Sequence, residues 1–167
     1  MAIIGDSITV LSAGAIEAAL GGVEKITAVG EIGYDIGQML PYARTIALTV
    51  PNTVVINLGT NDAAKGVPPA RSAVQLDSML AQFPQATRVL VTVNTHFDTA
   101  ECSARAQALN EHIRSVGYPV ADWNAAVSDE LAAGLPNGPV TSDTIHPTAY
   151  GQKILANLIA GALKSAS

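Results

Sequence analysis

Cysteine and aromatic residues are scarce in this chain of 167 residues. Cys102 is the only cysteine, so no internal disulfide can form and no cysteine-based metal site has the spacing it needs. We expect Cys102 to be an ordinary helix residue, because no neighbour in the sequence marks it as an activated thiol. Aromatic residues make up only 4% of the chain. Its core must therefore consist mainly of Ala, Val, Ile and Leu.

Charged residues and long apolar runs are also few. Charged residues make up 14% of the chain and hydrophobic residues 49%, which indicates one domain, residues 1–167, with a sizeable interior. The net charge is −5 and the 9 Lys and Arg residues are scattered, which argues against a nucleic-acid partner. No apolar run approaches the roughly 20 residues that cross a bilayer. The sequence thus predicts no membrane span.

The first residues lack a basic region followed by a long apolar stretch, so no signal peptide is visible. The first predicted strand begins almost at residue 1. This start is compatible with a domain of a longer protein whose export signal lies outside the sequence. The compartment therefore stays open, and a secreted or extracytoplasmic location is among the alternatives.

Apolar runs alternate with amphipathic stretches along the whole chain. The continuous apolar runs are typical of parallel strands covered on both faces, and we predict strands at Ala2–Ile4, Ile26–Val29, Thr53–Leu58, Val89–Val93 and Pro119–Ala121. Helices are predicted between and after them, at Ser12–Leu20, Ile36–Leu48, Pro68–Phe83, Cys102–Val116, Asn124–Ala133 and Thr148–Leu163. This order predicts an α/β fold with a doubly wound sheet of about five parallel strands.

Four polar or glycine-rich segments fall where such a sheet places its active crevice, beyond the carboxyl ends of the strands. Ser7 follows the first predicted strand, in Gly5-Asp6-Ser7-Ile8-Thr9. Residues 30–33 follow the second strand, residues 59–62 follow the third, and residues 143–147 precede the last helix. We therefore expect these segments to converge on one edge of the sheet.

The segments contain a nucleophile, a base and a group that can orient the base. A serine hydroxyl is a poor nucleophile until a base takes its proton, and His146 can do so for Ser7. Asp143 lies three residues earlier and can hold the other ring nitrogen of His146. Pro147 disfavours helical backbone at His146, so we expect the pair in an extended turn before the helix.

An oxyanion formed at Ser7 would need hydrogen-bond donors aimed at one point. The candidates are the backbone amide of Ser7, the backbone amide of a glycine in residues 30–33, and the side-chain amide of Asn61. Glycine permits close approach of backbone to a ligand. Gly30 and Gly33 both remain candidates, and the spacing favours Gly33.

These residues resemble the four sequence blocks of the SGNH hydrolases, also called GDSL esterases and lipases. The blocks are Gly5-Asp6-Ser7, Gly33, Gly59-Thr60-Asn61-Asp62 and Asp143-x-x-His146, in family order and over almost the whole chain. The resemblance implies a flavodoxin-like three-layer fold and a single catalytic domain. It also implies a triad of Ser7, Asp143 and His146, an oxyanion site of Ser7, Gly33 and Asn61, and neither a metal nor an organic cofactor.

Two details qualify the resemblance. Many members carry a threonine soon after the second-block glycine, whereas Tyr34-Asp35-Ile36 stands here, so the geometry of that loop can differ. Asp122-Trp123 is similar to SGNH domains attached to membrane acyltransferases.

Each motif alone also suits a simple turn or a helix cap, and it is their order that favours catalysis. Further polar residues have simpler interpretations. His96 either lines the cleft or is a loop residue, and His112 is expected on a solvated helix face. We expect Asp6 and Asp62 to tie loops together through backbone hydrogen bonds, and Asp35 to cap a helix.

The sequence therefore predicts a serine esterase that hydrolyses small, acetyl-like acyl esters through an acyl-enzyme. Short loops without a lid-sized insertion favour an open site, and acetylated saccharides fit it. Two alternatives stay open: transfer of the acyl group to a glycan, and a non-catalytic glycan-binding module. The partner is in each case a small-molecule or glycan ester or acceptor. The acyl length, the alcohol and the oligomeric state are left undetermined.

Overall fold

The computed structural model describes residues 1–21 and 25–166. Within them, five strands form one parallel sheet with the order β2-β1-β3-β4-β5. The strands are β1 (Ala2–Gly5), β2 (Thr27–Gly30), β3 (Thr53–Asn57), β4 (Thr87–Val91) and β5 (Val120–Ala121). This is the strand order of flavodoxin-like folds, in which the chain reverses its winding between β1 and β3. The predicted α/β fold is confirmed.

All five predicted strands are present, with shifts of one or two residues at most of their ends. The interior strands β1, β3 and β4 are almost entirely buried, as their continuous apolar sequences predict. Alternate residues face opposite sides of the sheet, so that Ile3 packs in one core and Ile4 in the other.

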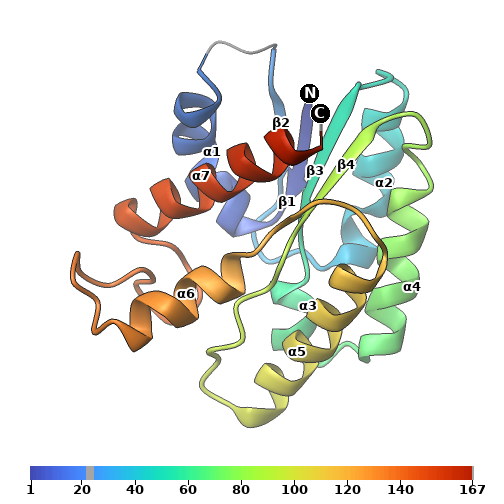
Figure 1. The fold of residues 1–167 in the computed structure, drawn as a ribbon. Helices are drawn as coiled ribbons and strands as arrows, with labels where there is room; N and C mark the ends of the chain where they lie inside the picture. Colours follow the sequence, from blue (N-terminus) through green and yellow to red (C-terminus); the bar gives the residue numbers. More distant parts are fainter. Residues whose placement is uncertain (22–24, 167) are drawn as a thin grey trace.

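Helices cover both faces of this sheet. The described helices are α1 (Ser7–Leu20), α2 (Ile36–Ala47), α3 (Thr60–Lys65), α4 (Pro69–Leu80), α5 (Ala100–Ser115), α6 (Trp123–Ala132) and α7 (Ala149–Ser165). Helices α1, α6 and α7 lie over one face, and α2, α4 and α5 over the other (Figure 1). Among the described residues, no helix combines the length and the apolar character that spanning a membrane requires.

Helix α1 begins five residues earlier than predicted. The sequence places its start at Ser12, because β-branched residues such as Ile8 and Thr9 are weak helix formers. In the structure Asp6 caps the helix by accepting a hydrogen bond from the Ile8 N–H at 3.0 Å, and Ser7 is the first helical residue. Ser7 thus sits on a helix terminus directly after β1.

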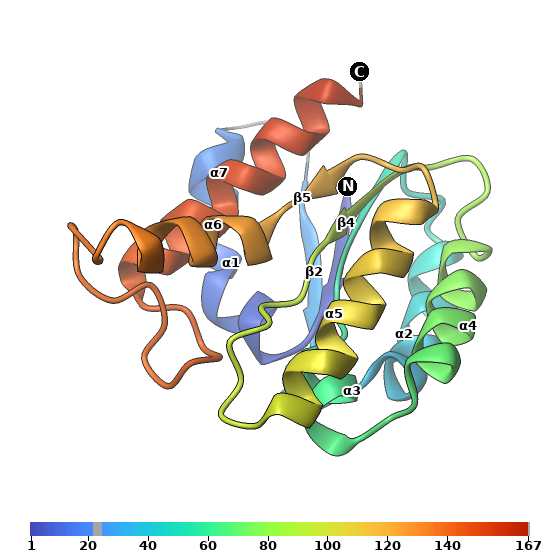
Figure 2. The ribbon, with the colours of Figure 1, turned by 60° about the horizontal axis from the view of Figure 1, so that its bottom comes forward.

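Helix α3 is absent from the prediction, which treats residues 59–62 as a loop. Glycines in left-handed conformations bracket this short helix, with Gly59 at its start and Gly66 at its end. Because glycine usually marks a turn or a loop, the sequence pattern gives no sign of the six helical residues between these two glycines. Figure 2 shows α3 at the end of the molecule where β1, β3 and β4 finish, between α2 and α5.

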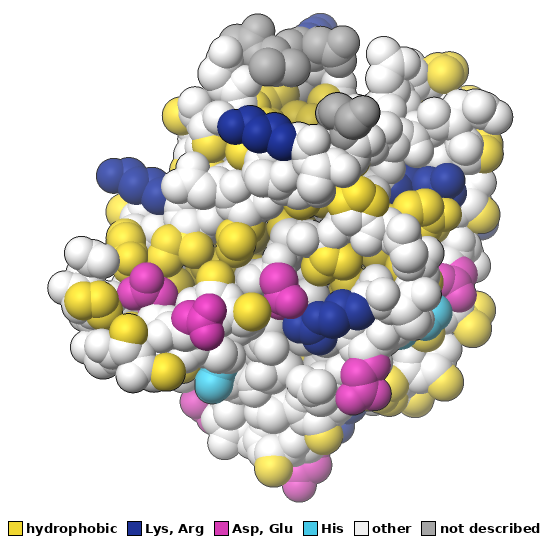
Figure 3. All heavy atoms as spheres, in the orientation of Figure 1, with side chains coloured by type: hydrophobic (Ala, Val, Ile, Leu, Met, Phe, Trp, Pro, Cys, Tyr) yellow, Lys and Arg dark blue, Asp and Glu magenta, His cyan; other side chains and the backbone are white. Residues whose placement is uncertain are grey.

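Two cores, one on each face of the sheet, fix the strand ends relative to the helices. On the face covered by α1 and α7, β1 and β3 contribute Ile3 and Val55, and α7 contributes Leu155 and Ile159. Figure 3 shows the outside of this face, where hydrophobic side chains form a band between α6 and α7 and several acidic side chains lie over α6. Helix α7 packs directly on α1. Because α1 starts at Ser7 and α7 follows His146, this packing draws the two ends of the chain together.

Candidate active site

Ser7 is held where β1 turns into α1. The turn is tight, because a Cβ on Gly5 would overlap the Thr9 hydroxyl and would lie 3.0 Å from the Asn57 carbonyl oxygen. Only glycine therefore fits at position 5. The side chain of Ser7 projects from the first turn of the helix, and the residue is 8% exposed. Its N–H belongs to the first turn, where a helix leaves four N–H groups without intrahelical partners.

His146 and Asp143 lie in a closed turn before α7. An antiparallel bridge joins Thr141 to Pro147, and the Ser142 N–H donates to the His146 carbonyl oxygen at 2.8 Å. Helix α7 begins only at Ala149, so His146 stands outside the helix as the sequence predicts.

The structure brings Ser7, His146 and Asp143 into one hydrogen-bonded chain. The Ser7 Oγ lies 3.0 Å from the His146 Nε2, and the His146 Nδ1 lies 2.7 Å from the Asp143 Oδ2. Asp143 Oδ1 also accepts the backbone N–H of His146 at 2.7 Å and that of Ile145 at 3.2 Å. Residues 139 positions apart in the sequence thus meet within hydrogen-bonding reach.

Electrostatics determine which atoms donate and which accept in these two side-chain hydrogen bonds. Burial raises the pKa of Asp143, but the hydrogen bonds from the His146 and Ile145 N–H groups and from the His146 ring outweigh it and lower the pKa below 3.8. An ionised carboxylate can only accept, so the His146 Nδ1 carries the proton toward Asp143. In the neutral ring, Nε2 then accepts the hydrogen bond from the Ser7 hydroxyl. That is the polarity a general base requires.

Asn61 lies in the first turn of α3 and is linked to the residue that precedes Ser7. Its Nδ2 donates to Asp6 Oδ2 at 3.2 Å, while Asp6 Oδ1 caps α1. One amide hydrogen of Asn61 is thereby fixed and the second is left for another acceptor. Asp6 is 1% exposed, and burial raises its pKa to about 6 against the lowering effect of the Ile8 and Asn61 hydrogen bonds. Asp6 therefore links the nucleophile's helix to the amide.

Asp62 has the corresponding structural role one residue later. It accepts the Ile36 N–H at 3.0 Å and the Ser72 hydroxyl at 2.9 Å, and it is 1% exposed. Burial raises its pKa, and the two hydrogen bonds oppose that effect. Asp62 thus joins the starts of α2 and α4 to α3. The prediction that Asp6 and Asp62 tie loops together through backbone hydrogen bonds is confirmed for Asp62, whereas Asp6 bonds the backbone N–H of Ile8 in its own turn and reaches another loop only through the Asn61 side chain.

The two candidate glycines lie in different surroundings. Gly30 is the last residue of β2 and pairs with Gly5 of β1. Gly33 lies beyond the strand in a turn at φ +78°, and within the described part of the chain its N–H has no hydrogen-bond acceptor. A Cβ at Gly33 would meet open space, so backbone conformation alone selects glycine there.

The next loop residue with a helix-capping role is Asp35, as predicted. It accepts the Gln38 N–H at 3.0 Å, and the Gln38 side chain returns a bond to the Asp35 N–H. This capping box replaces the threonine that the resemblance leads one to expect near this point. It fixes the loop that carries Gly33.

The remaining histidines do not join this hydrogen-bonded chain. His96 is exposed and its Nε2 lies 2.9 Å from the Ser128 hydroxyl of α6. His112 pairs with Asp77 Oδ1 at 2.8 Å, on the partly exposed side of α5. Cys102 lies in α5 as predicted and accepts a hydrogen bond from Arg105 at 3.2 Å.

One residue near the site was not among the predicted ones. Asn94, which follows β4, is 4% exposed, and its Nδ2 donates to the Thr144 carbonyl oxygen at 2.6 Å. Thr144 lies between Asp143 and His146. The signal in the sequence is a polar residue directly after a buried strand at the carboxyl edge of the sheet.

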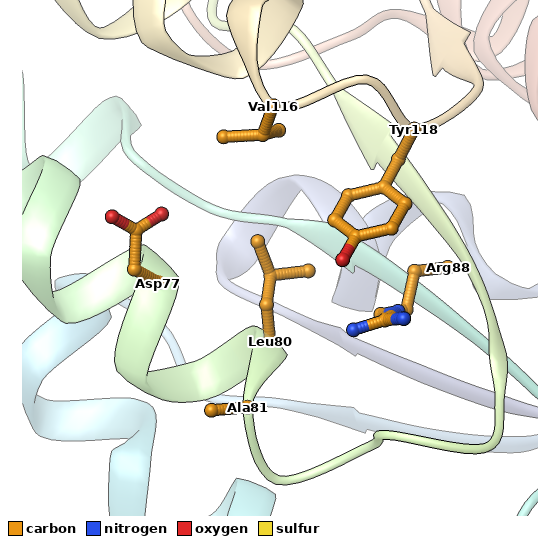
Figure 4. Close-up of a pocket in the computed structure, with 6 residues that line it drawn as sticks. All are labelled: Asp77, Leu80, Ala81, Arg88, Val116 and Tyr118. Carbon is orange, nitrogen blue, oxygen red and sulfur yellow. The ribbon is translucent and has the colours of Figure 1, made fainter.

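A hollow elsewhere on the surface is separate from these residues. It has a volume of about 380 Å³ and lies at the start of β4, between α4 and the end of α5 (Figure 4). Leu80, Val116 and the ring of Tyr118 form its apolar walls, and the guanidinium of Arg88 stacks 4.3 Å from the centre of that ring. None of the predicted site residues lines it. Within residues 1–21 and 25–166, no group of three His, Cys, Asp or Glu side chains could hold a metal ion.

The sequence model of the GDSL-like lipase/acylhydrolase family matches residues 3–154. The chain belongs to this family. The match includes all four sequence blocks and the turn with Asp143 and His146. No curated protein matches the chain at the sequence level.

Several solved structures have the same fold. The C-terminal catalytic domain of peptidoglycan O-acetyltransferase A from Streptococcus pneumoniae, solved with a methylsulfonyl adduct, is 24% identical with a TM-score of 0.74, covering 99% of this chain and 92% of that one. A lipolytic G-D-S-L protein from Veillonella parvula is 17% identical with a TM-score of 0.81, covering 98% and 97%. An acetyl xylan esterase, AlAXEase, is 14% identical with a TM-score of 0.72, covering 98% and 100%. At these identities the likeness is one of fold.

Proposed function

We propose that this chain is a serine esterase that cleaves short acyl esters, acetyl esters of saccharides above all, through an acyl-enzyme. Ser7 Oγ attacks the ester carbonyl carbon while His146 Nε2 takes the hydroxyl proton. Asp143 keeps the imidazole oriented and stabilises its protonated form. The tetrahedral intermediate then collapses, and the alcohol leaves with the proton that His146 returns.

The second half of the reaction reverses these roles. Water attacks the acyl group on Ser7 and gives its proton to His146. The carboxylic acid leaves, and the proton returns to the Ser7 oxygen. In both halves the oxyanion accepts hydrogen bonds from the Ser7 and Gly33 N–H groups and from Asn61 Nδ2. One such donor is typically worth about 3–4 kcal/mol in the transition state.

The single observation that supports this proposal best is the unbroken hydrogen-bonded chain from Ser7 through His146 to Asp143, at 3.0 Å and 2.7 Å. The ionised Asp143 gives that chain the polarity of a general base. Family membership adds the reaction class, because the family is one of lipases and acylhydrolases.

The loops around Ser7 and two proteins of like fold bear on the acyl length and the alcohol. The connections around Ser7 are short, with Gly33 and Asn61 each within a few residues of a strand end. Such an open site suits a small acyl group on a bulky alcohol. Two of the proteins of like fold are named for acetyl transfer to peptidoglycan and for acetyl xylan cleavage.

The deciding experiment compares the parent chain with Ser7→Ala in the hydrolysis of p-nitrophenyl acetate. We expect turnover by the parent and none above background by the variant. Esters of increasing acyl length, followed by O-acetylated xylan and O-acetylated chitin oligomers, then test the substrate class. Equal rates for parent and variant would refute the proposal. A non-catalytic module would also leave Ser7 unlabelled by a fluorophosphonate, whereas the esterase is labelled.

A second candidate function, transfer of the acyl group to a glycan, is favoured by the structural likeness to the O-acetyltransferase domain. It uses the same acyl-enzyme, with an acceptor hydroxyl in place of water. Product analysis with a glycan acceptor present separates the two functions. An acylated glycan would indicate transfer, and free acid alone would indicate hydrolysis.

A further inference from the structure

We propose that Asn94 is a positioning residue that holds the turn of Asp143 and His146 in its working geometry by hydrogen-bonding the Thr144 carbonyl oxygen. The proposal rests on the proposed function for its catalytic meaning. Its structural basis is independent, because Asn94 comes from the end of β4 and the turn precedes α7.

The turn needs an external support at Thr144. Thr144 has φ +67°, the left-handed region, which is sterically unfavourable for a residue with a Cβ. It is exposed, and so is the Asp143 side chain, at 55%. Burial therefore does not fix these two residues, although the adjacent Ile145 packs against the core on the α1 and α7 face. The support of this part of the turn comes from hydrogen bonds, and the one from Asn94 is the shortest to its backbone, at 2.6 Å.

Asn94 is suited to this task because its own amide is fixed. Its Oδ1 accepts the His96 N–H at 3.0 Å, which orients Nδ2 toward Thr144. The residue itself is 4% exposed, so its side chain has little contact with water.

The backbone around Asn94 is clamped from two helices. Asn110 of α5 bonds both the N–H and the carbonyl oxygen of Val93, each at 2.7 Å. Asn124 of α6 accepts the N–H of Thr95 at 2.8 Å and its hydroxyl at 2.7 Å. The segment after β4 is thus held in place from two sides, and the hydrogen bond from Asn94 to Thr144 anchors the exposed turn to it.

Such support matters because the reaction depends on small distances. A misplacement of about 1 Å in a reacting group can cost on the order of a hundredfold in rate. Without Asn94, Thr144 can leave its left-handed conformation. The spacing between Asp143 and His146 would then vary, and the ring of His146 would lose its fixed angle toward Ser7.

The test uses Asn94→Ala and Asn94→Asp with Asn110→Asp as a matched control. In both Asp variants the side chain keeps its acceptor oxygen for a backbone N–H and loses the amide donor to a backbone carbonyl. Both sites are buried, at 4% and 0% exposure, and both side chains hold backbone groups by hydrogen bonds, Asn94 from the segment after β4 and Asn110 from α5. Only Asn94 faces the catalytic turn.

Two readouts separate positioning from mere stability. In short-ester hydrolysis we expect both Asn94 variants to lower kcat by about tenfold to a hundredfold with little change in KM. Asn110→Asp keeps the bond from the Val93 N–H and leaves the Asn124 clamp intact, so it should lower the midpoint of thermal unfolding and lower kcat far less than the Asn94 variants. The second readout is the low-field proton NMR signal of the His146 Nδ1–H bound to Asp143. It should broaden or vanish in the Asn94 variants and persist in the control.

The outcomes are distinguishable from a failure of the proposed function. If the parent has no esterase activity, the proposed function falls, while the NMR comparison still tests whether Asn94 holds the turn. An unchanged low-field signal in a folded Asn94 variant would overturn the inference. So would a loss of kcat in Asn110→Asp as large as in Asn94→Asp, because the effect would then follow stability alone.

Discussion

The two sides of the candidate site are built by opposite means. On the Ser7 side, the organising carboxylate is Asp6, which is 1% exposed and bound to the Ile8 N–H and to Asn61. On the His146 side it is Asp143, whose side chain is 55% exposed and bound to two backbone N–H groups and an imidazole. Burial dominates at Asp6 and raises its pKa to about 6, whereas hydrogen bonds prevail at Asp143 and lower its pKa.

This contrast separates two requirements of the proposed reaction. Oxyanion donors must be rigid and shielded, because fixed dipoles act most strongly away from water. The base must instead exchange protons with the alcohol and with water, so it needs access as well as orientation. A buried scaffold serves the first requirement, and an exposed turn held by hydrogen bonds serves the second.

The largest effects are expected in the base relay of Ser7, His146 and Asp143, which joins the two sides. Ser7→Ala or His146→Ala should lower kcat by about 10⁶-fold, and Asp143→Asn by about 10⁴-fold, since each removes or misorients the base relay. Kinetics on a short p-nitrophenyl ester, with circular dichroism to verify folding, provide the measurement. Full activity in a folded Asp143→Asn variant would show that the turn orients His146 without its carboxylate.

On the buried side, Asn61→Ala should lower kcat by about a hundredfold to a thousandfold, because one oxyanion donor is lost. The matched control is Asn57→Ala. Asn57 is another buried amide that contacts α1, through the Thr9 hydroxyl at 3.0 Å, and it takes no part in the proposed chemistry. We expect the control to cost stability and to keep most of the activity. Equal kcat values for the two variants would remove Asn61 from the oxyanion site.

The buried carboxylate of Asp6 should also make the free energy of unfolding depend on pH. Because the pKa of Asp6 is about 6 in the folded chain and 3.8 ordinarily, the folded state binds more protons between those values. Stability contributed by this group is therefore highest at low pH and falls as the pH rises through about 6, by about 3 kcal/mol in all. Asp6→Asn removes this dependence.

The measurement is urea unfolding of the parent and Asp6→Asn at several pH values. Relative to the parent, the variant should gain about 3 kcal/mol in free energy of unfolding between about pH 4 and pH 7. A difference independent of pH would mean that Asp6 titrates normally, and the contrast between the two sides would lose its electrostatic basis.

Much of this arrangement follows from sequence pattern. Continuous apolar runs locate all five strands, and the strand-end rule places Ser7, Gly33, Asn61 and the Asp143 turn at one edge of the sheet. The turn before α7 is also predictable, since Pro147 keeps His146 out of the helix. These features depend on local periodicity and on backbone restrictions, which a sequence displays directly.

Other features depend on contacts between distant residues, which no local pattern records. Helix α1 starts at Ser7 because Asp6 caps it, against the weak helix propensity of the β-branched residues that follow. The link from Asp6 to Asn61 spans 55 residues, and that from Asn94 to Thr144 spans 50. Asparagine after a strand is common in loops, so only the fold reveals its partner.

The smallest expected effect is the pH dependence of the stability that Asp143 contributes. Its sign is opposite to that of Asp6, so it tests the contrast between the two sides directly. The pKa of Asp143 is lowered in the folded chain, so the unfolded state binds more protons between that lowered value and 3.8. Stability from Asp143 is therefore complete above 3.8 and is lost as the pH falls through the lowered pKa. Solvent screening at this exposed group keeps the effect small. Asp143→Asn should be slightly less stable than the parent at neutral pH and equally stable in acid, which unfolding curves at both pH values can measure. Parallel pH slopes for the Asp6 and Asp143 variants would contradict the division into a buried side and an exposed side.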